Sequence, residues 1–234
     1  MRPLIAVALL LLSSIARADE SPEAIAARAF EVMAGPAWEK ARHIAFTFNV
    51  ERDGKIVASY PQRLDRYTGD YQVSGKDREG RDYVVNVNAN TREGRAKLAG
   101  AEVAEPKELL ETGYRRFIND TYWLLMPLKL RDPGVTLESA GTRDDPCGNA
   151  WDVVKLTFDS VGLTPGDQYW VWVNRDTGLS DWWEMRLQDM KPEDPLRRFR
   201  MKKWERHGGI LISTLREEEG GTTRILLTDI EVTP

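Results

Sequence analysis

The sequence predicts an α+β domain built on a curved antiparallel sheet of about nine to eleven strands. Two segments, residues 22–34 and 106–121, repeat their apolar side chains with helical spacing. The segments between and after them alternate apolar with polar side chains and are joined by short turns, as in antiparallel hairpins. No repeat or low-complexity linker divides the chain, so residues 19–234 are expected to form one domain with its helices on the concave face.

The first predicted helix carries clear start and stop signals. Ser21 is a favourable N-cap, and Pro22 fits the first helical position. Gly35 and Pro36 end the helical pattern. The apolar side chains that share one face are Ile25, Ala29, Val32 and Met33.

A change of period marks the first strand, at residues 43–50. Its alternate apolar positions are Ile44, Phe46, Phe48 and Val50. Alternation of this kind predicts a strand with one buried face. The RDGK sequence at residues 52–55 is a hairpin signal, and further turn signals separate the strands that follow.

The second predicted helix runs into an unusually apolar segment. Leu109, Tyr114 and Phe117 recur at helical spacing, and Pro127 is expected to end the helix at or before Met126. An extended segment is expected from residue 128 onwards. The residues just before the proline form either an ordinary core segment or the wall of an apolar pocket: Tyr122, Trp123, Leu124, Leu125 and Met126.

The strand at residues 168–174 is apolar on both faces. Tyr169, Val171 and Val173 alternate with Trp170 and Trp172. A strand of this kind needs cover on both sides, from helices, a ligand or a partner. It is followed by a hairpin turn at residues 176–178 and by an amphipathic return strand that carries Trp183.

The chain begins with the features of a signal peptide. Arg2 precedes an apolar run at residues 4–12, and residues 16–18 form an A-x-A cleavage site. The run is too short to cross a bilayer, which requires about 20 residues. Removal of residues 1–18 would leave no cysteine to acylate at the new N-terminus, so we expect a periplasmic location and no integral membrane segment.

Composition argues against several classes of function. The chain carries 33 Lys and Arg against 37 Asp and Glu, which disfavours nucleic acid as a partner. Two isolated histidines and the lone Cys147 provide no metal-ligand spacing and no intramolecular disulfide. Since P-loop, GxGxxG and GxSxG motifs are also missing, we expect no cofactor, no metal and no enzymatic activity.

The aromatic residues point instead to an apolar ligand. The chain has eight tryptophans, and large apolar side chains that face a concavity bind lipids and similar molecules. Only one face of the strand at residues 168–174 can point inward, so not all candidates can contribute. The predicted ligand-binding residues are Phe46, Phe48, Tyr122, Trp123, Met126, Trp170, Trp172 and Trp183.

Residues 117–137 and 156–179 resemble a group of exported bacterial proteins of unassigned function. These share the pattern ND-x-YWLL-x-P-x-KL-x-DPGV, followed by TPGD and a D-x-TG-L hairpin. More distantly, the order of helices and strands resembles the LolA/LolB fold, an incomplete, strongly curved β-barrel lidded by helices around an acyl-chain cavity. The resemblance implies a LolA-like half-barrel domain over residues 19–234, and it carries over no catalytic residue.

These observations predict a periplasmic, non-enzymatic binder or carrier of an apolar ligand. The expected partner is a lipid, an acyl chain or a lipidated protein, with transient contact to envelope proteins. Two alternatives are an envelope interaction protein that uses an exposed aromatic patch and a carboxylate-dependent hydrolase. The first alternative differs from the carrier in presenting an exposed patch where the carrier has a cavity.

Export is predicted to remove the leader after Ala18, because a short apolar run precedes the A-R-A site. Intact mass spectrometry of the protein recovered from the periplasm measures the cleavage position. A mass that still includes residues 1–18 would contradict the prediction.

Overall fold

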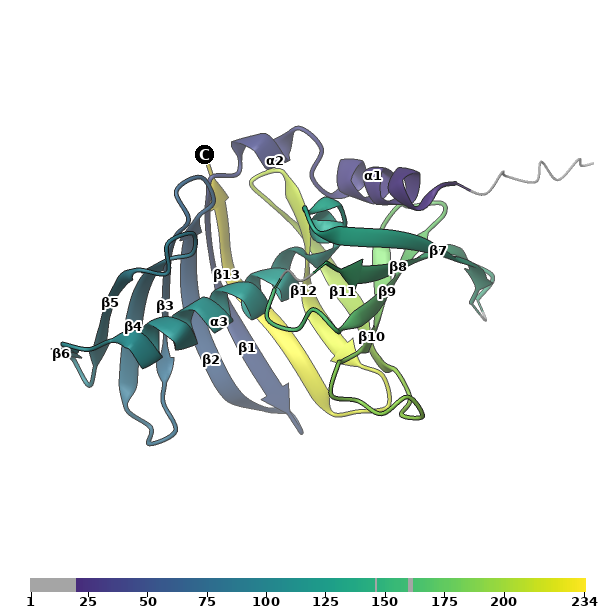
Figure 1. Cartoon of the computed structure of the whole chain (residues 1–234). Coiled ribbons are helices and arrows are strands. Elements are labelled where there is room, and N and C mark those ends of the chain that lie inside the picture. The colour runs from purple at the N-terminus through teal and green to yellow at the C-terminus, as the bar shows by residue number, and fades with distance from the viewer. Residues whose placement is uncertain (1–19, 146, 160–161) are drawn as a thin grey trace, which may run out of the picture.

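The computed structural model describes residues 20–145, 147–159 and 162–234, so the predicted leader lies outside the described residues. These residues form one open, curved antiparallel sheet of 13 strands, with helices on its concave side (Figure 1). The α+β architecture is therefore confirmed. The strand count was wrong, because the edge strands are largely exposed and lack the alternation that marks a half-buried strand.

The sheet order is β6-β5-β4-β3-β2-β1-β13-β12-β11-β10-β9-β8-β7. The strands are β1 (His43–Arg52), β2 (Lys55–Asp65), β3 (Asp70–Lys76), β4 (Asp82–Asn88), β5 (Gly94–Leu98), β6 (Ala101–Glu102), β7 (Val135–Asp144), β8 (Ala150–Phe158), β9 (Gln168–Asn174), β10 (Ser180–Arg186), β11 (Arg197–His207), β12 (Ile210–Glu218) and β13 (Thr223–Thr233). The first and last strands pair at the centre, so two meanders join into one sheet.

Helix α1 (Pro22–Met33) forms as its end signals predict. The Ser21 hydroxyl accepts a hydrogen bond from the backbone N–H of Ala24 at 3.2 Å. The helix is tied to the sheet by Arg28, whose Nη2 lies 2.6 Å from Oδ2 of Asp152. Arg175 shares that carboxylate from the other side, with 2.7 Å between Nε and Oδ1. A short helix, α2 (Ala37–Lys40), then leads into β1.

Helix α3 (Lys107–Leu125) crosses the concave face of the sheet (Figure 1). It connects β6 and β7, which lie at opposite edges of the sheet, so the chain has to pass over the strands between them. A helix of 19 residues is about 28 Å long, at 1.5 Å per residue. Helix and sheet approach closely at Gly113, where an added Cβ would lie 2.6 Å from Cγ1 of Val85.

The segment after α3 differs from the sequence expectation. Residues 126–131 continue as a 3-10 helix, η1 (Met126–Arg131), where an extended segment was expected. Pro127 is compatible with this because it occupies the first turn, where its missing N–H costs no helical hydrogen bond. Leu128 and Leu130 are buried under the helices, and their burial favours the compact conformation.

Gly113→Ala is expected to lower the free energy of unfolding by about 1–3 kcal/mol, because the new methyl group overpacks the contact with Val85. At an ordinary helix position the same change stabilises by about 1 kcal/mol. Urea unfolding measures the effect, with Glu111→Ala on the exposed side of α3 as the control.

The double variant Gly113→Ala/Val85→Ala should lose less free energy of unfolding than the two single variants lose together. Removing the methyl groups of Val85 makes room for the new methyl group at position 113. Strict additivity of the two losses would show that the close approach has no energetic consequence.

Candidate apolar ligand site

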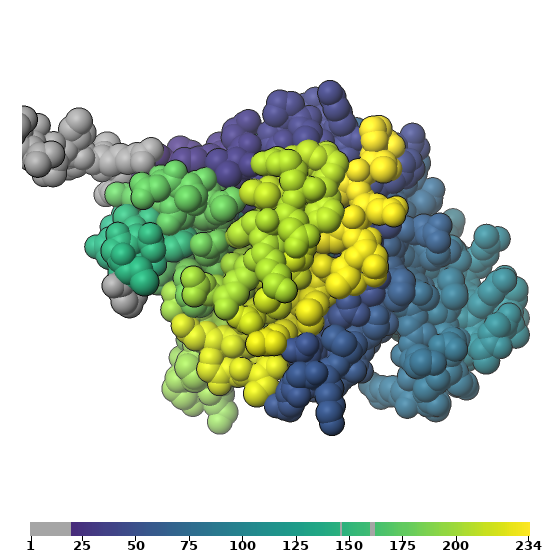
Figure 2. All heavy atoms as spheres, turned by 180° about the vertical axis from the view of Figure 1, so that it is seen from behind, coloured from purple at the N-terminus to yellow at the C-terminus, as the bar shows by residue number. Residues whose placement is uncertain are grey.

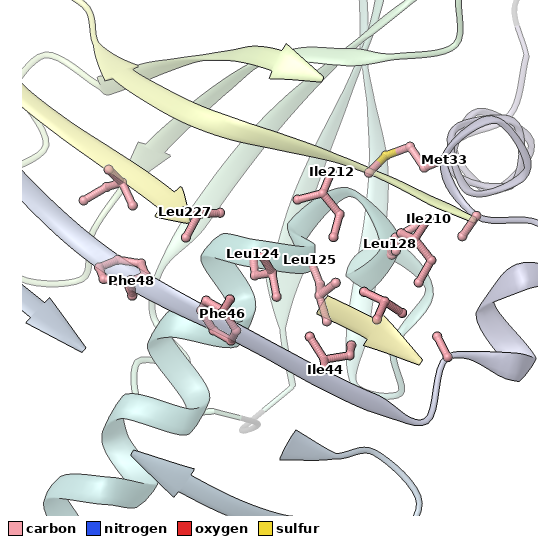
Figure 3. Packing of buried hydrophobic residues seen from close by; sticks show 14 residues of the cluster. Met33, Ile44, Phe46, Phe48, Leu124, Leu125, Leu128, Ile210, Ile212 and Leu227 are labelled. Atoms are coloured by element: carbon pink, nitrogen blue, oxygen red, sulfur yellow. The ribbon is translucent and has the colours of Figure 1, made fainter. Parts of the chain in front are cut away.

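The inner face of the sheet is apolar, and the C-terminal half of α3 packs directly on it. Phe46 and Phe48 project from β1 towards the helix, which contributes Leu124 and Leu125 (Figure 3). Strand β12 adds Ile210 and Ile212 to the same cluster. The alternation seen in β1 thus buries one face beneath α3, as predicted.

Six aromatic side chains extend this apolar surface towards β8–β11. We call them the aromatic cluster: Tyr122, Trp123, Phe158, Tyr169, Trp183 and Phe199. The ring of Trp123 lies 4.5 Å from that of Trp183 and 4.9 Å from that of Phe199, centroid to centroid. Tyr122 lies 5.8 Å from Trp183. The aromatic cluster therefore joins α3 to four strands of the sheet.

The structure brings six of the eight predicted residues to the helix-covered side of the sheet. They are Phe46, Phe48, Tyr122, Trp123, Met126 and Trp183. The other two, Trp170 and Trp172, lie on the opposite face. Trp183 pairs across the strands with the buried Val171, whereas Trp172 pairs with Trp182. Cross-strand partners share a face, so Trp170 and Trp172 are excluded from the concave site.

Three members of the aromatic cluster were missed as site residues: Phe158, Tyr169 and Phe199. For Tyr169 the signal was present, since it alternates in phase with Val171 and Val173. Which of the two alternating sets of side chains points inward depends on the register of β9 with its neighbours. Because both sets are apolar, the sequence of the strand does not show which set is buried.

Two hydrogen-bond donors within the aromatic cluster have no acceptor among the residues that the structure describes. They are the hydroxyl of Tyr122 and the indole N–H of Trp183, both buried. Burial raises the pKa of the Tyr122 hydroxyl well above its ordinary value of 10.0, so the group remains a donor. A buried donor without an acceptor destabilises a folded protein by about 1–3 kcal/mol.

A polar network fastens the middle of α3 to the sheet. Asp120 is fully buried, and its Oδ2 accepts a hydrogen bond of 2.5 Å from Nε2 of Gln62 on β2. The Tyr71 hydroxyl donates to Oε1 of Gln62 at 2.6 Å. Arg116, one turn earlier on α3, lies 3.4 Å from Oδ1 of Asp120. Burial outweighs these contacts and raises the pKa of Asp120.

The outer face of the sheet carries no helix over β11–β13 and β1 (Figure 2). An open groove of about 1160 Å³ runs along β1–β5 and β13 and touches Phe46. Its lining includes Arg63, Gln72, Asn86 and Arg95, so it is much more polar than the concave face. None of the other predicted site residues lines this groove.

Comparison with known proteins identifies the fold. No family model matches the sequence, and no curated protein does. Among solved structures, a LolA superfamily protein from Nitrosomonas europaea superposes with a TM-score of 0.54 at 11% identity, covering 92% of this chain and 95% of that one. The fold is LolA-like. This confirms the distant resemblance to the LolA/LolB fold that the order of elements indicated.

A DUF1329 family protein from Desulfovibrio piger is also similar in structure to this LolA-like chain. Its TM-score is 0.51 at 12% identity, over 92% of this chain and 94% of that one. Identities this low establish the shared fold alone. In the part of the LolA-like chain that the structure describes, no helix has the length and apolarity of a membrane span.

Asp120→Asn is expected to change how stability depends on pH. The raised native pKa means that the unfolded state ionises first, so wild-type stability falls as pH rises from about 3.8 through the native pKa. Asparagine does not titrate. The free energy of unfolding of the wild type should therefore decline relative to that of the variant over this interval.

Urea unfolding at several pH values measures the difference, with Asp189→Asn at an exposed position as the control for losing one carboxylate. A wild type that gains stability relative to Asp120→Asn as pH rises would show that hydrogen bonds and Arg116 outweigh burial.

Proposed function

We propose that this chain is a non-enzymatic carrier that binds an apolar ligand between α3 and the concave face of its sheet. One observation carries the proposal: the aromatic cluster joins helix to sheet while burying two donors that have no acceptor among the described residues. A ligand with an acyl chain and a carbonyl oxygen would fill this interface and satisfy such donors.

The energy for binding would come mainly from apolar area. Removing apolar surface from water contributes about 25 cal/mol per Å², so an acyl chain that replaces part of the α3 contact needs no charged partner to bind usefully. The side chains beneath α3 are packed against one another, and Met126 is fully buried. Binding therefore requires α3 to move away from the sheet.

The attachment of α3 is compatible with such a movement. Five of its 19 residues are buried: Gly113, Asp120, Thr121, Leu124 and Leu125. Its N-terminus has no side-chain cap. A single-layer helix of this kind can separate as one unit and expose the aromatic cluster beneath it.

The LolA-like fold supports the class of ligand without identifying it. The LolA superfamily neighbour shares the fold over 92% of this chain. An acyl chain, a lipid or a lipidated protein remains the proposed partner, and the leader predicted from the sequence would deliver the carrier to the periplasm.

The arrangement of buried carboxylates disfavours a hydrolase. Glycoside hydrolysis of the usual kind needs two carboxylates that flank a cleft. Asp120 is engaged by Gln62, and Asp152 is held between Arg28 and Arg175, in separate networks that fasten helices to the sheet.

A second candidate function rests on the outer face. The guanidinium of Arg198 lies 4.5 Å from the ring centroid of Trp172 and 4.0 Å from that of Trp182. Half-buried tryptophans stacked with arginine are common at protein interfaces. Under this alternative, a protein of the cell envelope docks on these tryptophans. The binding surface is then the outer face of the sheet, and not the concave face as in the carrier proposal.

Trp123→Ala is expected to weaken binding of a fluorescent fatty acid to the delipidated protein by about tenfold, equivalent to about 1.4 kcal/mol of lost contact. Trp172→Ala is the matched control, because both tryptophans are half-buried but lie on opposite faces of the sheet. Fluorescence titration gives the affinities, and thermal unfolding separates binding from stability.

Failure of the wild type to bind the probe at micromolar concentration would overturn the carrier proposal. Equal weakening by the two variants would show that binding does not occur beneath α3.

A further inference from the structure

A buried arginine lies beneath the C-terminal end of α3. Arg216 belongs to β12 and is 1% exposed. Its cross-strand partners are Met201 on β11 and Ile225 on β13, both buried on the concave side. The guanidinium therefore enters the apolar layer between sheet and helix.

The contacts of Arg216 are all to neutral acceptors. One terminal nitrogen donates to the backbone carbonyl of Ser213, and the other donates to that of Leu124 on α3 at 3.4 Å. Its Nε has no acceptor among the described residues, and no ion pair with a carboxylate is formed within that part of the chain. Burial lowers the pKa of Arg216 to about 9, so the side chain still carries its charge at neutral pH.

Two other buried charges are compensated by arginine, whereas Asp167 accepts hydrogen bonds from neutral donors on Thr164, Tyr169 and Gln188. Asp152 is held by two arginines, and Asp120 has Arg116 within 3.4 Å. A buried charge that faces only neutral dipoles is strongly destabilising relative to one paired with an opposite charge. The uncompensated charge of Arg216 therefore indicates a functional role in the proposed binding layer.

We propose that Arg216 is the anchor for the acidic head of a long-chain amphiphile, a carboxylate or a phosphate. This inference rests on the proposed carrier function and specifies the class of ligand. A guanidinium presents paired N–H groups that match two oxygens of either head. The acyl chain would extend over the aromatic cluster, because Trp123 precedes the residue whose carbonyl Arg216 contacts.

The movement of α3 that admits the acyl chain also exposes Arg216. When α3 leaves the sheet, the carbonyl of Leu124 withdraws from the guanidinium and one terminal nitrogen loses its acceptor. An acidic head supplies both an acceptor and a compensating charge, in a region of low dielectric constant where the pair attracts strongly. Opening of the helix and capture of the head are thereby coupled.

A purely structural role makes a different prediction. Arg216 contacts a carbonyl in the last turn of α3, where a positive charge stabilises a helix through its dipole. That role affects the stability of the protein and the position of α3, but it does not distinguish an acidic ligand from a neutral ligand with the same chain. Selectivity for the head group separates the two roles.

The test compares ligands that share one chain and differ in the head. Dodecanoic acid, methyl dodecanoate, dodecyl phosphate and dodecanol are titrated at neutral pH against a bound fluorescent probe, using the wild type and Arg216→Met. Arg200→Met is the control, because Arg200 is exposed on the outer face of the neighbouring strand β11 and contacts Trp182 there.

The wild type is expected to bind at least one acidic ligand about tenfold more tightly than its neutral counterpart. Arg216→Met should lose this preference while binding the neutral ligands within about threefold of the wild type. Arg200→Met should behave as the wild type does. Whichever of the carboxylate and the phosphate binds more tightly identifies the head.

Equal affinity of the wild type for acidic and neutral ligands would overturn the anchor and leave the carrier function standing. A preference that survives in Arg216→Met would also overturn it. If no ligand binds the wild type, the carrier function itself fails. Should Arg216→Met not fold, Arg216→Gln takes its place, and the head-group preference of the wild type alone still decides the first outcome.

Discussion

Pairing of β1 with β13 is the interaction on which the rest of the architecture depends. It joins the N-terminal and C-terminal meanders into one sheet, and the two strands run antiparallel from the pair His43 and Thr233 to the pair Arg52 and Thr223. Once the halves are joined, β6 and β7 become the opposite edges. The connection between these consecutive strands must then cross the whole concave face, and α3 is that connection (Figure 1).

This topology places a helix over an apolar surface without building it deeply into the core. α3 touches the sheet through contacts of several kinds. The close approach of Gly113 to Val85 and the Asp120–Gln62 hydrogen bond hold its N-terminal and middle parts, and the aromatic cluster holds its C-terminal part. Apolar contacts of the last kind are non-directional, so an acyl chain can replace them with little loss of energy. The polar links are directional and would return the helix to one position.

Buried polar groups lie beneath α3 within an otherwise apolar interface. Protein interiors pair nearly all their donors, yet Tyr122, Trp183 and the Nε of Arg216 have no acceptors in the described part of the chain. Each such group reduces the stability of this arrangement, and under the proposed function a ligand that brings oxygen atoms would supply the acceptor. On the outer face Trp172 and Trp182 are stacked with Arg198, and the indole N–H of Trp172 likewise has no acceptor among the described residues. The same strands thus present an apolar face covered by α3 and an outer face on which tryptophan and arginine side chains stack.

The sequence by itself determined the features that depend on neighbouring residues. The caps of α1, the alternation along β1 and the turn at residues 52–55 are set within a few residues of chain, so their patterns predicted them correctly. Six of the eight predicted residues lie beneath the helices for the same reason, since period and burial are linked wherever one face of an element is polar.

Only the tertiary structure decided the rest. The face of β9 that points inward depends on its register with β8 and β10, and both of its faces are apolar. The 3-10 turn at Pro127 depends on the burial of Leu128 and Leu130 by distant elements. Asp120 meets Gln62 across 58 positions, and Arg216 meets Leu124 across 92. Such contacts form because the β1–β13 pairing brings remote segments together, and no local pattern records that pairing.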